Sequence, residues 1–573
     1  MSSHHDHDYD VIIVGSGVAG ALTAWKLSEF GNYRILILEA GDNGIGQGQR
    51  IQFHHMMDTQ GNRGDPFAPY MDLKSRRFAP QAEKSQRELA DQRADPNNYY
   101  DYAADSPDAF KASYNRLVGG STWAWRGNTP RYLPSDFRMQ SRFGVGRDWP
   151  IDYNEIEPWY AQAEHELGVS GEHDEADGLF GGWRSQPFPM PGIPMSYSDR
   201  LVKQRIDGKQ VRGTTVRVVT TPQARNSRAF DHRPACEGHS NCIPLCPIGA
   251  KYDATVHLRR ALAHHHVSLR TGAVVSRLGQ GADGKVNAVF FKDWKSSDPK
   301  KEHQVRGRIV VLAAHAIETP KILLASSGLA NSSGQVGKNL MDHIQFEQIA
   351  MFPDPLYPFR GPQSVAAIEA FRDGPFRSTR SGFRMTIGND GWGRAGSPAT
   401  VIDGLLGQGF YGSTLPQKVA DAIPKMLRLS FSTEMLPEAT NRVELSDKLD
   451  ALDIPRPKFR FEIGAYVEAA LREGVATSLD LFALMGATVK PKALDNPTTG
   501  RMNWNTAAHI MGTTIMGDEP ATSVVNRWGR AHDVPNLWIM GSSVFVSSAT
   551  ANPTLTVAAL TLRSAQAIHR ELH

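Results

Sequence analysis

The first forty residues contain two patterns of apolar and polar positions, one typical of strands and one typical of a helix. An unbroken apolar run from Val11 to Val14 leads into a glycine-rich turn, and a helical pattern with apolar Ala21, Trp25 and Leu27 follows. A second apolar run, "RILILEAG" at 34–41, comes next. Short continuous apolar runs separated by a helical period are typical of strands in a parallel sheet, buried on both faces. The pattern predicts a strand–helix–strand unit at the start of the chain.

Later segments extend this pattern and add a different one. Residues 307–328, "GRIVVLAAHAIETPKILLASSG", predict a buried strand, a turn of small residues and a helix. The strand-like runs at 425–436 and 456–463 predict a second sheet, which would form a roof over the first, and residues 465–487 predict a helix with one apolar face. Residues 46–112 are long, polar and irregular, which suits either a lid or partner-docking surface or a solvated insertion.

The first turn carries three glycines in a spacing that has a physical use. Gly15 would make the tight turn, Gly17 would let a pyrophosphate approach the backbone, and Gly20 would let the helix pack on the strand. The helix N-terminus then faces the phosphates, and Glu39 at the end of the second strand suits ribose hydroxyls. This pattern predicts a dinucleotide site but does not separate FAD from NAD.

Composition narrows the class of protein. The 573 residues are 40% hydrophobic and 21% charged, with a net charge of +3, as in a soluble globular protein with a sizeable core. No basic stripe argues for nucleic acid, and no run of eighteen apolar residues argues for a membrane span. Because no membrane span is predicted, we expect membrane association only through partners. The N-terminal "MSSHHDHDYD" lacks the features of a secretory signal.

Five blocks together resemble the glucose-methanol-choline family of FAD oxidoreductases, in that family's order. They lie at 114–137, 307–328, 336–343, 503–517 and 536–568. Within the family, the chain is most similar to the flavin subunits of bacterial multisubunit sugar dehydrogenases, which oxidise glucose, fructose, gluconate or the C3 hydroxyl of glucosides. The resemblance implies an α/β fold, with a discontinuous Rossmann-like FAD-binding domain and an α+β substrate domain built on an antiparallel sheet.

The resemblance also implies domain limits and cofactor contacts. The FAD-binding domain is expected at 1–45, 113–155, 205–345 and 521–573, and the substrate domain at 346–520. Contacts with FAD are implied for Gly119, Gly120 and Ser121 at the flavin, Ala313 and Ala314 at the adenosine, Gly541 and Ser542 at the pyrophosphate or ribityl chain, and a helix starting near Thr554 at the flavin pyrimidine. Some relatives attach flavin through a histidine at the position of Ala124, so we expect non-covalent FAD here.

Two residues match the catalytic positions of the family. Oxidising an alcohol with a flavin requires a base that is neutral at the working pH and within reach of the hydroxyl. His509 in "NTAAHIMG" matches the catalytic histidine, and Asn552 in "SATANPTLT" matches the second position. We expect His509 to be the general base and Asn552 to position the substrate oxygen.

All three cysteines of the chain lie within the loop 233–253. Cys236, Cys242 and Cys246 are spaced Cys-x5-Cys-x3-Cys-Pro, and three thiolates can complete a [3Fe–4S] cluster. The similar sugar dehydrogenases carry such a cluster on a trio of this spacing. The competing interpretation is a Cys3His zinc site that uses His232, His239 or His257.

An iron–sulfur cluster beside a flavin predicts a dehydrogenase that passes its electrons to an electron-transfer chain. By resemblance, the partners are a small subunit with a twin-arginine export signal and a cytochrome c subunit, and the compartment is the periplasm, with the cytoplasm as the alternative. The substrate is expected to be a sugar or glycoside, with a weak preference for glucoside C3 oxidation. The other functions considered are a sugar or alcohol oxidase that uses O2 and a non-enzymatic electron-transfer subunit.

Overall fold

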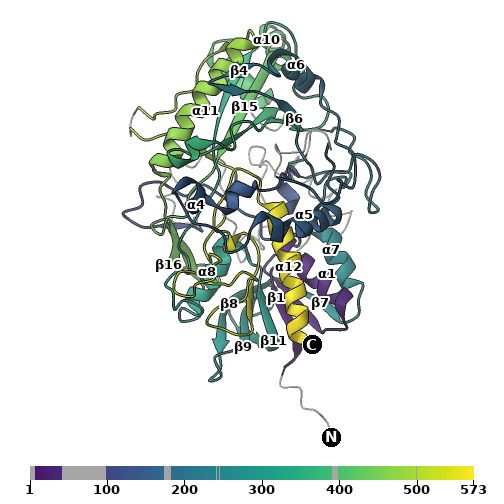
Figure 1. Cartoon of the computed structure of the whole chain (residues 1–573), viewed down its shortest axis with the longest axis vertical. Coiled ribbons are helices and arrows are strands. Elements are labelled where there is room, and N and C mark those ends of the chain that lie inside the picture. Colours follow the sequence, from purple (N-terminus) through teal and green to yellow (C-terminus); the bar gives the residue numbers. More distant parts are fainter. Residues whose placement is uncertain are drawn as a thin grey trace.

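The computed structural model has two stacked halves (Figure 1). It describes residues 7–41, 99–172, 182–239, 242–243, 245–389, 398–497 and 500–573. The first strand, β1, and the last helix, α12, both belong to the lower half, so the two ends of the chain meet in one domain.

A five-stranded parallel sheet forms the centre of the lower half. Its strand order is β20-β11-β1-β2-β7, and all neighbouring pairs are parallel. The strands are β1 Tyr9–Val14, β2 Ile35–Glu39, β7 Val267–Thr271, β11 Gly307–Leu312 and β20 Leu537–Ile539. β1, β2 and β11 are almost entirely buried, as their continuous apolar runs predicted.

Helices pack beside this sheet and run away from its carboxyl edge. α1 (Val18–Phe30) contacts both α7 (Thr255–Leu262) and α12 (Thr554–Leu572), and α5 (Tyr153–Leu167) packs on α12. α12 begins near the middle of the molecule and descends to its lower end (Figure 1). Its first residue is Thr554, where the sequence predicted the last helix to start.

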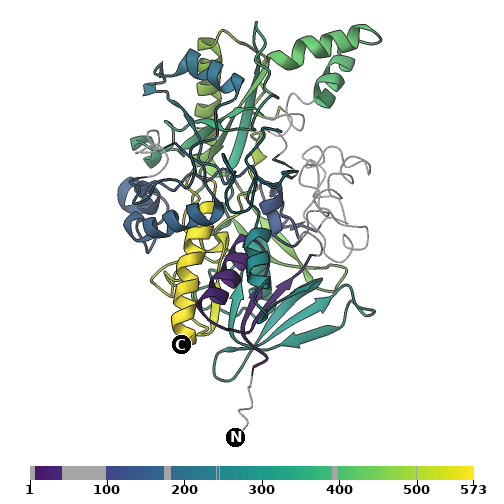
Figure 2. The same cartoon turned by 90° about the vertical axis from the view of Figure 1, so that its right-hand side faces the viewer.

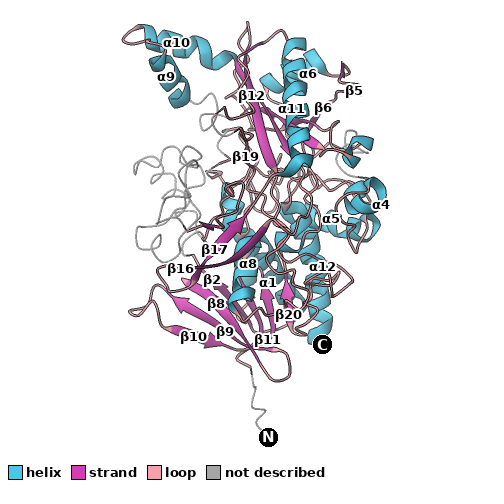
Figure 3. Ribbon diagram, turned by 90° about the vertical axis from the view of Figure 1, so that its left-hand side faces the viewer, coloured by secondary structure: helices cyan, strands magenta, loops and turns pink. Residues whose placement is uncertain are grey.

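Two small sheets complete the lower half (Figure 3). One, of order β10-β9-β8, is antiparallel and contacts β2 and β11. The other, of order β16-β17-β3, contacts helix α8 (His315–Ala325). The strands are β3 Asp101–Tyr102, β8 Ala273–Gln280, β9 Val286–Asp293, β10 Glu302–Val305, β16 Arg442–Leu449 and β17 Pro455–Arg460.

The upper half is built on a seven-stranded sheet whose pairings are antiparallel, of order β18-β12-β15-β14-β13-β6, with β19 also paired to β12. Helix α11 (Gly464–Leu484) packs across β12 and β15. The strands are β6 Val218–Thr220, β12 Ile344–Met351, β13 Ala366–Ile368, β14 Phe383–Gly388, β15 Met426–Thr433, β18 Thr488–Val489 and β19 Asn505–Thr506.

Shorter elements join and flank the two halves. α9 and α10 pack on each other and project from the upper half (Figure 2). The remaining elements are α4 Met139–Phe143, α6 Tyr197–Ile206, α9 Pro398–Gly407, α10 Thr414–Ala422, the two-residue strands β4 Gln210–Val211 and β5 Thr214–Thr215, and the 3₁₀ turns Gly120–Ala124, Pro134–Phe137, Pro375–Ser378, Ile423–Lys425 and Ser542–Val544. No helix in the described part of the chain is both long enough and apolar enough to span a bilayer.

The structure differs from one sequence expectation and describes part of a second segment. Of the two runs predicted to form the roof sheet, β15 is in it, but β17 joins β16 and β3 in the lower half. Within the expected insertion 46–112, residues 46–98 lie outside the described residues. Of the described residues 99–112, Tyr99 and Tyr100 are buried, and Asp101 and Tyr102 pair with β17.

Candidate active site

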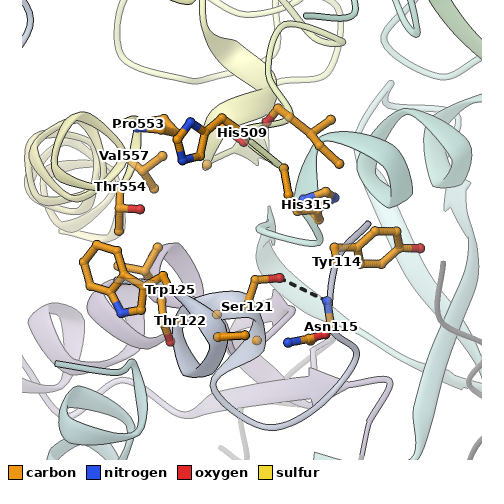
Figure 4. A pocket seen from close by; sticks show the side chains of 18 of the residues that line it. Tyr114, Asn115, Ser121, Thr122, Trp125, His315, His509, Pro553, Thr554 and Val557 are labelled. Carbon is orange, nitrogen blue, oxygen red and sulfur yellow. Dashed lines mark hydrogen bonds between the residues drawn. The ribbon is translucent and has the colours of Figure 1, made fainter. Parts of the chain in front are cut away.

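A cavity of about 350 Å³ lies between the two halves, at the carboxyl ends of β1, β2 and β11. That volume is within the range of cofactor and small-molecule sites. In open parallel sheets, ligands bind outside these strand ends. Side chains from the upper sheet, including Gln345 and Ser432, close the cavity from above. Figure 4 shows the wall formed by α12, the 3₁₀ turn at Ser121, the loop that carries His509 and the start of α8 at His315.

The three glycines of the first turn have different surroundings. Gly15 has φ +99°, and a Cβ there would lie 2.5 Å from the carbonyl oxygen of Ala313. A Cβ on Gly20 would overlap the carbonyl oxygen of Gly15, so Gly20 serves packing and does not line the cavity. Nothing lies within 4 Å of a Cβ on Gly17, which faces the cavity. The backbone is therefore bare at the point where a phosphate would approach it.

Glu39 lies on the cavity wall at the end of β2. Its Oε2 accepts hydrogen bonds from the Ser16 amide (2.9 Å) and hydroxyl (2.6 Å), and its Oε1 accepts one from the Gly41 amide (2.8 Å). Burial raises the pKa of this carboxyl above its usual value. Oε1 accepts only one of these hydrogen bonds and can accept a second, so Glu39 can still take a ribose hydroxyl.

The predicted flavin-side segment lies against the glycine turn. Gly120, Ser121 and Ala124 line the cavity, and Ser121 Oγ accepts a hydrogen bond from the Asn115 amide at 3.0 Å (Figure 4). Gly119 is absent from the wall. It has φ +94°, and its amide donates to Ser16 Oγ at 3.1 Å, which ties the two loops together.

The remaining predicted cofactor residues also surround the cavity. Ala313 and Ala314 line it from the end of β11, and Gly541 and Ser542 from the end of β20. Gly541 has φ +111° and open space where a Cβ would stand. Thr554 lines the cavity at the start of α12, so the N-terminus of this helix faces the cavity. The backbone amide groups of a first helical turn favour negative charge nearby. The bare glycines, the acid on β2 and this helix terminus fit a dinucleotide such as FAD.

The two predicted catalytic residues are neighbours in the same cavity. The Nε2 atom of His509 lies 3.2 Å from Nδ2 of Asn552. Burial is the largest cause that places the pKa of His509 well below its usual value, and nearby His343, Arg384 and Arg126 lower that pKa further. His509 is therefore neutral near pH 7, as a general base has to be.

The structure adds residues that the sequence analysis did not assign. His343 Nδ1 lies 2.8 Å from His509 Nδ1, and Arg384 Nη1 donates to Asn552 Oδ1 at 3.3 Å. Asp342 accepts hydrogen bonds from the backbone amides of both histidines. His343 and Asp342 lie in the block 336–343, but nothing in its spacing pointed to a contact with residue 509, because the two are joined only by tertiary folding.

The three cysteines line one small pocket beside the main cavity, and none of them is in a disulfide. Ile243, next to Cys242 in the chain, lines the main cavity itself. In the described part of the chain, no group of three or more histidine, cysteine or acidic side chains is already arranged to hold a metal ion.

The histidines proposed for a zinc site differ in position. His257 is buried away from the thiols and bonds Tyr252 and Glu166, whereas His239 lines the thiol pocket beside Glu237. His232 is absent from the pocket wall.

The fold and the cavity fit a flavin-type oxidoreductase, because a site suited to a dinucleotide lies at the end of a parallel sheet and a neutral histidine lines the same cavity. The family models described as GMC oxidoreductase match residues 9–345 and 437–561. The chain belongs to the GMC oxidoreductase family, as the sequence blocks predicted, and is an FAD-dependent dehydrogenase of CH–OH groups.

Relatives match the chain over almost its whole length. It is 34% identical to the fructose dehydrogenase large subunit of Gluconobacter japonicus, covering 98% of both chains. It is 23% identical to the gluconate 2-dehydrogenase flavoprotein of Pantoea cypripedii (98% of this chain, 94% of the relative). It is 24% identical to the C-glycoside 3-oxidase of Microbacterium trichothecenolyticum (98% and 97%).

A solved structure confirms the fold. The chain superposes on pyridoxine 4-oxidase from Mesorbium loti with a TM-score of 0.60 at 17% identity, covering 98% of this chain and 99% of that one.

Proposed function

We propose that this protein is the flavin subunit of a multisubunit sugar dehydrogenase. It oxidises a secondary or anomeric hydroxyl of a sugar or glycoside to a carbonyl and sends the electrons through a [3Fe–4S] cluster to a cytochrome c partner. The observation that carries the proposal is the neutral His509–Asn552 pair, which shares one cavity with the dinucleotide glycines. The similarity to the large subunit of a fructose dehydrogenase supports the choice of substrate class.

The polar groups of the pair suit an alcohol. A substrate hydroxyl placed between the two side chains donates its proton to His509 Nε2, and the Asn552 amide donates to the same oxygen. The O–H bond breaks as the N–H bond forms. Bound FAD supplies the acceptor for the hydride that leaves the carbon. Because His509 is buried and uncharged, it takes up this proton without first losing one.

The surroundings of the thiol pocket support an anionic cluster there. Arg225 is buried, and its Nη1 lies 3.2 Å from Cys242 Sγ. Its other hydrogen bonds go to Gln223 and to the carbonyl of Gln363, and it has no carboxylate partner among the described residues. A buried cation requires an anion nearby, and thiolates carrying a cluster would provide it. When bound, the cluster supplies one-electron transfer.

Neighbouring residues of one loop line the two pockets, which suits electron exit. Cys242 lines one pocket and Ile243 the other. The Lys251 ammonium donates to the carbonyls of Trp123 (2.6 Å), Trp125 (2.5 Å) and Cys242 (2.8 Å). Trp125 lines the main cavity, so one buried side chain holds the cysteine loop against the wall of the FAD site.

The test is an anaerobic screen of the purified protein. Fructose, gluconate, glucose and glucosides are each mixed with the FAD-loaded protein, bleaching of the flavin is followed, and the new carbonyl is located. Both fructose and glucoside C3 remain arms of the screen, because the first follows from the 34% identity and the second from the sequence preference. If no sugar bleaches the flavin, the proposed substrate class is wrong.

The electron acceptor and the compartment are tested separately. We expect iron and sulfide in the purified protein and little peroxide with sugar in air. Zinc without iron, or rapid peroxide formation, favours the oxidase alternative, which similarity to a C-glycoside 3-oxidase supports. Export to the periplasm with a twin-arginine-bearing small subunit is part of the proposal, and cell fractionation tests it.

A further inference from the structure

His343 makes the contacts that decide which nitrogen of His509 carries a proton. Its Nε2 atom lies 3.0 Å from the carbonyl oxygen of Ser548 and 2.9 Å from that of Ala549. A carbonyl oxygen can only accept a hydrogen bond, so the proton of His343 is on Nε2. Burial lowers the pKa of His343 to about 4, so the ring is neutral near pH 7 and its Nδ1 atom has a free lone pair.

The same logic then fixes His509. Its Nδ1 atom lies 2.8 Å from the Nδ1 atom of His343, with the two rings nearly perpendicular at 88°. Since His343 Nδ1 is the acceptor, His509 Nδ1 has to be the donor. The neutral imidazole of His509 has one proton, so its Nε2 atom is left with the lone pair.

The other side of His509 agrees with this assignment. Asn552 Oδ1 accepts from Arg384 Nη1, which identifies that atom as the amide oxygen. The amide nitrogen Nδ2 therefore faces His509 Nε2 and donates to it. Arg384 is itself held by Glu369, whose Oε1 accepts from its Nε at 2.5 Å. The hydrogen bonds on the His343 side and those on the Asn552 side therefore agree: the proton of His509 is on Nδ1 and its lone pair is on Nε2.

We propose that His343 is the positioning residue of the reaction. It accepts a hydrogen bond from His509 Nδ1–H and so keeps the lone pair of His509 on Nε2. There the substrate hydroxyl takes the place of the Asn552 amide as the donor to Nε2. When His509 Nε2 takes up the hydroxyl proton, the imidazolium keeps its Nδ1–H bond to His343, which shares the positive charge. The backbone supports the geometry, because both carboxylate oxygens of Asp342 are engaged and Oδ1 bonds the amides of His343 and His509.

The inference rests on the proposed function for the identity of the substrate. The contacts between His343 and His509 do not depend on it. The charged groups that act on this pair are Arg384 and Arg126 beside His509, and Glu434 and Arg384 beside His343. None of them replaces the 2.8 Å contact between the rings. A neutral acceptor at the position of His343 Nδ1 should therefore preserve the proton arrangement, and an apolar side chain should remove it.

The first test uses no substrate. In the FAD-loaded protein labelled with ¹⁵N-histidine, we expect one imidazole N–H proton far downfield of the amide protons, coupled to a single nitrogen. It should vanish in both His343→Leu and His509→Asn. It should persist in His532→Asn, a matched control whose ring bonds Ser523 and the carbonyl of Gly517. Absence of this proton from the wild type, or its survival in His343→Leu, would overturn the inference.

The second test uses whichever sugar bleaches the wild-type flavin. We expect His343→Leu to slow flavin reduction by about 30-fold or more, with substrate dissociation constants little changed and a larger solvent deuterium isotope effect, because removal of the hydroxyl proton becomes the slow step. His343→Asn, whose amide oxygen can accept from His509 Nδ1, should recover most of the rate. If His343→Leu reduces its flavin at the wild-type rate, the inference is wrong. If no sugar reduces the wild type, the proposed function fails and the first test still decides the role of His343.

Discussion

At the scale of the residue, the chemistry depends on which atoms water cannot reach. Burial lowers the pKa of His509 far enough that the ring stays neutral near pH 7, and the amide of Asn552 lies within 3.2 Å of its Nε2 atom. The sequence could identify both residues, because each stands in a recognisable motif. It could not identify His343 as their neighbour, since a contact across 166 residues is formed only by the folded chain.

Substitution of the base tests this reading directly. We expect His509→Ala to lower the rate of flavin reduction by about 100-fold or more, because the hydroxyl proton then has no acceptor. The protein should still bind FAD with an unchanged yellow spectrum, because the glycine turn and the α12 terminus hold the cofactor. Stopped-flow reduction under nitrogen measures the rate, and near-normal reduction by His509→Ala would exclude the role.

The pH dependence of that rate follows from the direction of the shift. The pKa of His509 lies well below 6.5, so the base loses its lone pair only in acid. We expect the rate of flavin reduction to stay level from alkaline pH down to at least about pH 6.5 and to fall below that as His509 becomes protonated. A rate that already halves near pH 7 would mean that an ordinary, solvated histidine is the base.

At the scale of the element, the strand–turn–helix unit around β1 and α1 was readable from sequence because local rules decide it. Its apolar runs, its glycine spacing and its terminal acid all belong to one short segment. The sheet membership of β17 was not readable, because a strand-like pattern says nothing about which neighbours the strand pairs with. Strand β17 pairs with β16 along the chain and with distant β3, away from the roof sheet.

Two glycines of that unit allow a matched pair of substitutions. Gly20→Ala should destabilise the flavin-free protein by about 1–3 kcal/mol, because the added methyl group overlaps the Gly15 carbonyl oxygen. Gly17→Ala adds a methyl group in open space at φ −66°, so it should cost at most about 1 kcal/mol, as the loss of a glycine cap.

For FAD binding, the order of the two effects should be reversed: Gly17→Ala should weaken binding more than Gly20→Ala. Gly17→Ala places its methyl group where a pyrophosphate would approach, so we expect a clear loss of FAD affinity with a nearly normal melting temperature. FAD titration followed by flavin fluorescence, together with thermal unfolding of the stripped protein, measures both. Equal effects of the two variants on FAD affinity would show that the pyrophosphate does not approach the turn at Gly17.

At the scale of the whole molecule, the two halves enclose one cavity, and the cysteine loop abuts its wall. Arg225 and Lys251 are both buried in this region: one meets a cysteine sulfur, and the other fastens the loop to the tryptophan segment. The sequence indicated the loop through the spacing of its thiols. It did not indicate the two buried cations, because arginine and lysine are usually solvated and nothing in their spacing marks these two.

This arrangement predicts that substrate oxidation and electron exit can be separated. Cys242→Ser removes one thiolate of the trio, so we expect the protein to lose its iron. Flavin reduction by sugar should remain within a few-fold of the wild-type rate, because His509 and Asn552 are untouched. Turnover with a cytochrome c acceptor should fall by about 100-fold or more, since the two electrons on the flavin then lack the one-electron carrier.

Ser227→Ala, at an exposed hydroxyl that bonds the Pro191 carbonyl, is the control and should retain iron and turnover. Full cytochrome reduction by an iron-free Cys242→Ser protein would mean that electrons leave the FAD cavity by another route.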